Sequence, residues 1–141
     1  MTDSSSRPAA PALEAQALGA SLTVSDLSRS IAWYRDVLGF AVAREYAPRG
    51  TRVAAALSAG TVEILLTQDN GALGTSRVKG QGFSLQFTVG HSAEDIDALA
   101  AGITQRGGVL EDEPVTMAGA RAFRLRDPDG FKLVFSSPRK R

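Results

Sequence analysis

Few side chains in this sequence are suited to nucleophilic or acid–base chemistry. The chain has one histidine, His91, and no cysteine, so hardly any residues could form a catalytic dyad of a nucleophile and an imidazole base. A carboxylate such as Glu63 remains a candidate general base that acts without a metal ion. No G-x-G-x-x-G or phosphate-loop lysine motif occurs, so the glycine pairs are interpreted as turns.

Metal ligation is poorly supported by the residues themselves. A catalytic metal needs three or four converging donors, whereas His91 stands alone before a predicted helix, where a place in a surface loop is favoured. Asp127 and Asp129 are carboxylates of the type that bind hard cations. Both belong to Asp127-Pro-Asp-Gly130, however, which is already explained as a tight turn because Pro128 presets φ and Gly130 supplies a positive φ.

Length and charge indicate one domain with a small-molecule partner. The 141 residues are 43% hydrophobic, and their 16 basic and 15 acidic residues leave a net charge of +1, which favours neither nucleic acid nor a membrane surface as partner. The absence of cysteine is compatible with the cytoplasm. We interpret residues 1–16 as a mobile N-terminal tail, with Leu13 as its only sizeable apolar anchor for docking on a partner subunit, and residues 137–141 as a solvated basic tail.

The order of predicted elements occurs twice, about 65 residues apart. Residues 17–25 and 82–89 have the alternation of strands, and helices are predicted over Ser28–Leu38 and Ser92–Arg106, with Gly39 and Gly107-Gly108 ending them. The copies correspond residue by residue: Val24 to Val89, Ile31 to Ile96 and Leu38 to Ile103. Three further strands follow each helix, at Phe40–Tyr46, Thr51–Leu57 and Val62–Thr67, and at Val109–Thr116, Arg121–Arg126 and Phe131–Ser136.

This internal repeat predicts an α+β fold made of two βαβββ modules with pseudo-twofold symmetry. The modules span about residues 17–80 and 81–136 of a single domain at 17–136.

Two motifs identify a resemblance to a known superfamily. SDLSRSIAWYRDVLGF, Ser25 to Phe40, and FRLRDPDGFKLVF, Phe123 to Phe135, resemble the vicinal oxygen chelate superfamily of glyoxalases, extradiol dioxygenases and bleomycin-resistance proteins. The resemblance covers about Ala17 to Ser136. It implies curved mixed sheets around a cavity, helices on the outer faces and a homodimer.

The same resemblance implies four metal-ligand positions, and this chain has no donor at any of them. They are occupied by Gly19, Leu65, Ser84 and Val134. None of these side chains makes a conventional glyoxalase-type centre, so we expect no metal and no other cofactor.

Strand alternation then assigns the polar residues that share the cavity face with those four positions. Glu63, Gln86, Arg124, Arg126 and Lys132 are the most informative among them. The candidate ligand-binding set is Glu63, Leu65, Ser84, Gln86, Arg124 and Val134.

Each polar residue also has a structural interpretation. Glu63 fits a rim carboxylate paired with Lys132 or an arginine about as well as a ligand contact, and Gln86 fits a hydrogen bond to a neighbouring strand. Arg124 and Arg126 fit solvated positions at a sheet edge. Trp33 and Tyr34 are interpreted as core.

The favoured function is a metal-independent small-molecule-binding protein that sequesters a drug or metabolite. The basic residues Arg124, Arg126 and Lys132 favour an anionic or carbonyl-bearing ligand. The alternative is a glyoxalase-like lyase, isomerase or dioxygenase with a displaced metal site or with Glu63 as its base.

Overall fold

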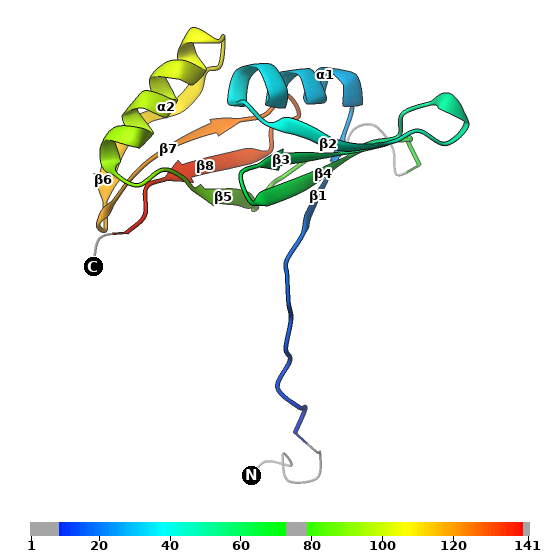
Figure 1. Ribbon diagram of the computed structural model, residues 1–141, viewed down its shortest axis with the longest axis horizontal. Coiled ribbons are helices and arrows are strands. Elements are labelled where there is room, and N and C mark those ends of the chain that lie inside the picture. The colour runs from blue at the N-terminus through cyan, green and yellow to red at the C-terminus, as the bar shows by residue number, and fades with distance from the viewer. Residues whose placement is uncertain (1–8, 73–78, 140–141) are drawn as a thin grey trace.

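The computed structural model describes residues 9–72 and 79–139, and it contains two copies of a βαβββ module (Figure 1). The first module consists of β1 (Ala20–Val24), α1 (Leu27–Trp33), the π-helical turn η2 (Tyr34–Leu38), β2 (Ala41–Tyr46), the 3-10 turn η3 (Pro48–Gly50), β3 (Ala54–Ala59) and β4 (Val62–Gln68). The second consists of β5 (Ser84–Thr88), α2 (Ala93–Gln105), β6 (Leu110–Met117), β7 (Ala120–Arg126) and β8 (Lys132–Ser136).

The two modules form two separate four-stranded mixed sheets. Their strand orders are β1-β4-β3-β2 and β5-β8-β7-β6, so the second repeats the first. In each sheet the first strand pairs in parallel with the last strand of the module, and the remaining pairs are antiparallel. This topology confirms the predicted α+β fold of two similar modules. The sheets do not close into a barrel.

Local side-chain chemistry fixes the helix ends. The helix predicted from Ser28 begins at Leu27, because the Asp26 carboxylate accepts a hydrogen bond from the Arg29 backbone N–H at 3.1 Å. It continues through η2 to Gly39, whose φ of 89° ends it. Ser92 is the N-cap of α2, as predicted.

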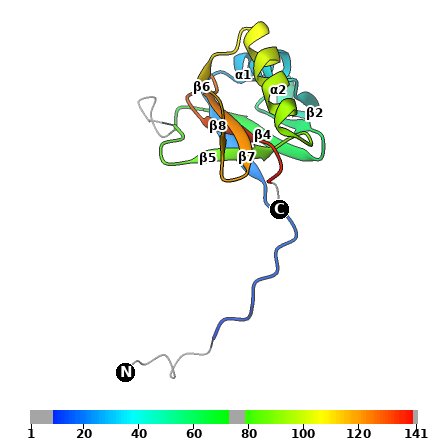
Figure 2. The ribbon, with the colours of Figure 1, turned by 90° about the vertical axis from the view of Figure 1, so that its left-hand side faces the viewer.

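The core lies between the helices and one side of the two sheets. Both helices lie over that same side (Figures 1 and 2), where they bury Ile31, Tyr34, Ile96 and Ile103. A row of aromatic rings joins the modules: Tyr34 to Phe40 at 5.4 Å between centroids, Phe40 to Phe87 at 5.9 Å, and Phe87 to Phe135 at 4.9 Å. Tyr34 is a fully buried core residue, as predicted, and Trp33 is partly buried and packs edge-on against it at the border of the core.

The other side of the sheets carries no helix within the described ranges. Residues 9–19, which precede β1, extend away from the sheets on this side (Figures 1 and 2), and the Leu13 side chain is 92% exposed. Residues 1–8 of the predicted tail and 140–141 of the predicted basic tail lie outside the described residues. No helix in the described ranges is long and apolar enough to cross a bilayer.

Candidate functional site

Strand alternation divides each sheet into a core face and an open face, which we define as the face turned away from the helices. On β4, Ile64 and Leu66 are buried in the core, while Leu65 between them belongs to the open face and is half-buried. On β8, Leu133 and Phe135 are buried and Val134 lies on the open face. Leu65 and Val134 therefore lie on the face turned away from the helices, as strand alternation predicted.

The predicted ligand-binding residues lie on the open faces in two groups, one on each sheet. In the first sheet, Leu65 is flanked by Ser21 and Ala56. In the second sheet, Val134 is flanked by Gln86 and Arg124, and Ser84 lies beside Lys132. Gly19 is exposed and precedes β1.

Glu63 of β4 is paired with Arg44 of β2 in the same sheet. Its carboxylate accepts hydrogen bonds from Arg44, with the closest N···O distance 2.8 Å. Of the two partners predicted for Glu63, Lys132 or an arginine, the structure has the arginine. The Arg44 guanidinium lowers the pKa of Glu63 below its ordinary value, first through the hydrogen bond and then through its charge. A carboxylate held ionised in this way is a weak proton acceptor near neutral pH.

Arg44 lies opposite Ala56 because of a β-bulge between Val42 and Arg44. An unbroken register would have placed Arg44 opposite Ala55, whose side chain is fully buried on the core face. The sequence carries no clear signal of this bulge, which is why Arg44 was missed.

The two arginines of β7 are also paired. Arg124 forms an ion pair with Asp112 of β6, and Arg126 binds Glu111 at 3.0 Å and the Gly130 carbonyl oxygen at 3.0 Å. Neither guanidinium is therefore free to act alone as an anion receptor. Both arginine side chains remain about half exposed, so they are solvated as well as paired with a carboxylate.

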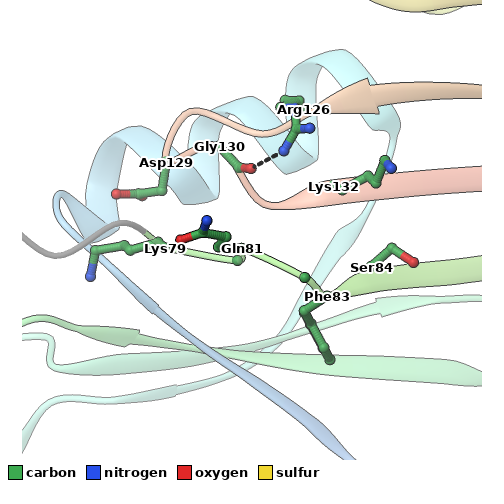
Figure 3. A pocket seen from close by; sticks show the side chains of 10 residues that line it. Lys79, Gln81, Phe83, Ser84, Arg126, Asp129, Gly130 and Lys132 are labelled. Atoms are coloured by element: carbon green, nitrogen blue, oxygen red, sulfur yellow. Dashed lines mark hydrogen bonds between the residues drawn. The ribbon is translucent and has the colours of Figure 1, made fainter.

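A cavity of about 690 Å³ opens at one end of the second sheet (Figure 3). It lies where residues 79–83 enter β5 and where the Asp127–Gly130 turn leads into β8. Its lining consists of Lys79, Gly80, Gln81, Gly82, Phe83, Ser84, Arg126, Asp129, Gly130 and Lys132. Of the six predicted ligand-binding residues, Ser84 lines this cavity and the other five lie elsewhere on the open faces.

Lys79 fastens the segment that forms one wall of this cavity. Its ammonium group donates to the Thr23 carbonyl oxygen at 3.0 Å and pairs with Asp69 at 2.8 Å. Both charged side chains are only 14% exposed, so the pair holds residue 79 against the end of the first sheet. No local pattern marks Lys79 in the sequence, because Thr23, one of its two partners, is 56 residues away in the chain.

The residues at the four positions where the resemblance implies metal ligands do not fit a metal. Gly19, Leu65 and Val134 offer no side-chain donor, and within residues 9–72 and 79–139 no three His, Cys, Asp or Glu side chains cluster closely enough to hold an ion. His91 is exposed before α2, as predicted. Asp127 accepts hydrogen bonds from Tyr34 and two backbone N–H groups, which supports its interpretation as a turn residue.

Comparison with known proteins places this sequence in a family. The family model described as Glyoxalase/Bleomycin resistance protein/Dioxygenase superfamily matches residues 16–135. The sequence has no significant match among curated proteins.

Solved structures share the fold at low sequence identity. A glyoxylase/bleomycin resistance protein/dioxygenase domain from Frankia sp. is 22% identical with a TM-score of 0.74, over 91% of this chain and 95% of that one. A glyoxalase/bleomycin resistance protein/dioxygenase from Nocardioides is 17% identical with a TM-score of 0.69, over 89% and 85%. A virulence protein from Salmonella typhimurium is 26% identical with a TM-score of 0.65, over 89% and 98%.

Proposed function

Because the chain belongs to the glyoxalase/bleomycin resistance protein/dioxygenase superfamily, we propose that it binds a small organic molecule on its open faces without a metal ion. The observation that carries this proposal is that Gly19, Leu65, Ser84 and Val134 stand at the four positions where the resemblance implies metal ligands. Half-buried apolar side chains at Leu65 in the first sheet and Val134 in the second, each with polar neighbours, suit binding of an organic ligand better than metal chemistry.

Sequestration is a better description of this function than catalysis. The one candidate base, Glu63, is neutralised by Arg44 and its pKa is lowered, which works against proton abstraction. A protein of this fold without donors at the implied metal positions, and with its one candidate base paired to an arginine, is suited to holding a drug or metabolite. We place this activity in a homodimer in the cytoplasm, formed by the domain at residues 17–136.

Exposed apolar side chains support the proposed dimer. Val109 is 82% exposed, and Met117, at the end of edge strand β6, is 72% exposed. Such residues lose their contact with water when a second subunit covers them. Sedimentation at micromolar concentration is expected to show a dimer, and a species that stays monomeric contradicts this part of the proposal.

The primary test is identification of a ligand that copurifies with the protein, by native mass spectrometry. Gln86→Ala and Arg124→Ala are each expected to weaken binding of that ligand, and Arg35→Ala, at an exposed position of η2, is the control. Unchanged binding in both open-face variants would reject these contacts.

Elemental analysis addresses the alternative of a metal-dependent lyase, isomerase or dioxygenase. We expect substoichiometric zinc, iron, manganese and nickel, and no loss of stability on adding a chelator. One equivalent of metal would overturn the metal-independent proposal and direct attention to Glu63 and His91.

A further inference from the structure

We infer that the ligand is a monoanion, and that Lys132 and Ser84 bind its carboxylate group in the cavity at the end of the second sheet. This inference rests on the proposed function and adds a substrate class to it: apolar carboxylic acids. It also makes Lys132, and not Arg124 or Arg126, the residue that binds the anionic group of the ligand.

The charge pairing of the open faces leads to Lys132. Each of the other basic side chains there or in the cavity has a carboxylate partner: Arg44 with Glu63, Arg124 with Asp112, Arg126 with Glu111, and Lys79 with Asp69. The Lys132 ammonium group makes no ion pair or hydrogen bond with any residue in the described ranges. It is therefore the cation of the cavity that is available to a ligand.

Strand register places a hydroxyl donor next to that cation. Ser84 of β5 is directly opposite Lys132 of β8 on the open face, and neighbouring strands lie about 4.8 Å apart. The Ser84 hydroxyl likewise has no hydrogen-bond partner among the described residues. Because the two residues are neighbours on one face and the lysine side chain is long and flexible, the ammonium group and the hydroxyl group can each donate to one oxygen of the same carboxylate.

The acidic residue of the cavity is directed away from this point. Asp129 accepts a hydrogen bond from the Ser25 backbone N–H at 3.1 Å and a second from the Ser25 hydroxyl, so the start of α1 holds its carboxylate. Figure 3 shows Asp129 and Lys132 on opposite sides of Gly130. Lys132 is thus not neutralised from within the cavity.

The same pairing sets the charge of the ligand. One free ammonium group balances one negative charge, whereas a dianionic phosphate ester would need a second cation, and Arg126 and Lys79 are already bound to carboxylates. Phe83 is 49% exposed in the cavity lining, and Val134 follows Lys132 by two residues on the same face. Phe83 offers apolar surface to the body of an acid bound in the cavity, whereas Val134 lies beyond the cavity lining on the open face.

Lysine labelling gives a direct test, because the chain contains only three lysines, Lys79, Lys132 and Lys140. With ¹³Cε-labelled lysine, the Lys132 signal is assigned from its loss in Lys132→Met. Benzoate is expected to shift this signal saturably, and the neutral isostere benzamide to bind about fivefold more weakly, as for a partly exposed charge pair. Phenyl phosphate is expected to bind no more tightly than benzoate.

Variants separate charge from shape. Lys132→Arg should retain benzoate binding, Lys132→Met should reduce it to the level of benzamide, and Ser84→Ala should weaken it about twofold. Arg35→Met lowers the net charge equally at an exposed position of η2 and should leave benzoate binding unchanged.

Three results would overturn the inference: equal affinity for benzoate and benzamide, unchanged benzoate binding in Lys132→Met, or no Lys132 response to any of the probes. Tighter binding of phenyl phosphate than of benzoate overturns the monoanion assignment. The backbone amides of Gln86 and Val134 report on the proposed function independently. If they respond equally to charged and neutral probes, the open face binds small molecules and only the anion preference fails.

Discussion

The Tyr34 hydroxyl donates a hydrogen bond of 2.8 Å to the Asp127 carboxylate, and this contact joins the first helix of one module to the turn before the last strand of the other. Both side chains are buried. Asp127 also accepts from the backbone N–H groups of Asp129 and Phe131, each at 2.9 Å. The DPDG turn therefore shapes the cavity wall and fastens the two modules together.

Tyr34→Phe is expected to lower the free energy of unfolding by about 1–3 kcal/mol, because it leaves one oxygen of a buried carboxylate without its donor. Urea denaturation measures the change. Tyr46→Phe is the matched control: the Tyr46 hydroxyl is exposed and only accepts from Arg44, so its loss should cost at most about 0.5 kcal/mol. Equal stability of Tyr34→Phe and the wild type would show that the buried contact does not stabilise the fold.

Asp127→Asn is expected to change how stability depends on pH. Burial raises the pKa of Asp127 above its ordinary value, so the folded state binds the proton more tightly than the unfolded state does. As pH rises through the raised pKa, the wild type should lose stability relative to Asp127→Asn, by about 1.4 kcal/mol for each tenfold difference in proton affinity. Above that window the difference is constant.

Urea denaturation of both proteins at several acidic pH values measures this difference in stability. Subtracting one curve from the other cancels the pH dependence that comes from the carboxylates present in both. Among those, Glu63 and Asp95 have lowered pKa values and act in the opposite direction. If the stability of the wild type instead rises relative to that of Asp127→Asn as pH rises, hydrogen bonding to the carboxylate outweighs its desolvation.

Ser30→Ala is expected to raise stability by about 1 kcal/mol. The Ser30 side chain is fully buried in α1, and its hydroxyl has no hydrogen-bond partner among the described residues. Removing the hydroxyl removes the cost of its desolvation. Ser28→Ala, which deletes an exposed hydroxyl that accepts from Arg52, is the control, and thermal unfolding compares the two. A lower melting temperature for Ser30→Ala argues against this explanation.

Gly108→Ala is expected to destabilise the protein by about 1–3 kcal/mol through overpacking. A Cβ at this buried position would lie 2.4 Å from Ile103 Cγ2 and 2.9 Å from Val37 Cγ1, so it would strain the contact between the end of α2 and η2. A Cβ at Gly19 would meet nothing within 4 Å, so Gly19→Ala should be neutral. Chemical denaturation of Gly108→Ala and Gly19→Ala compares their stabilities. It tests whether the cost comes from the close packing around Gly108 and not from replacing a glycine as such.

Much of the fold was predictable from the sequence because it depends on local periodicity. Phe83, Leu85 and Phe87 alternate with Ser84 and Gln86, and this alternation alone indicated a strand and its two faces. The capping of α2 by Ser92 and the turn at Gly130 are likewise set by neighbours in the chain. The same local logic placed Leu65 and Val134 on the open face. Their role in ligand binding stays a prediction.

The pairing of charges on the open faces was decided by the tertiary structure. Bulges in the equivalent edge strands β2 and β6 shift the register, so that Arg44 lies on the open face near Glu63 and Asp112, not Glu111, lies opposite Arg124. A one-residue shift moves a side chain from one face of a sheet to the other, and no local pattern in these strands specifies it. The sequence by itself determined the two modules and the residue types at the four implied metal positions, whereas the register of distant strands determined which arginines are paired with carboxylates and left Lys132 unpaired among the described residues.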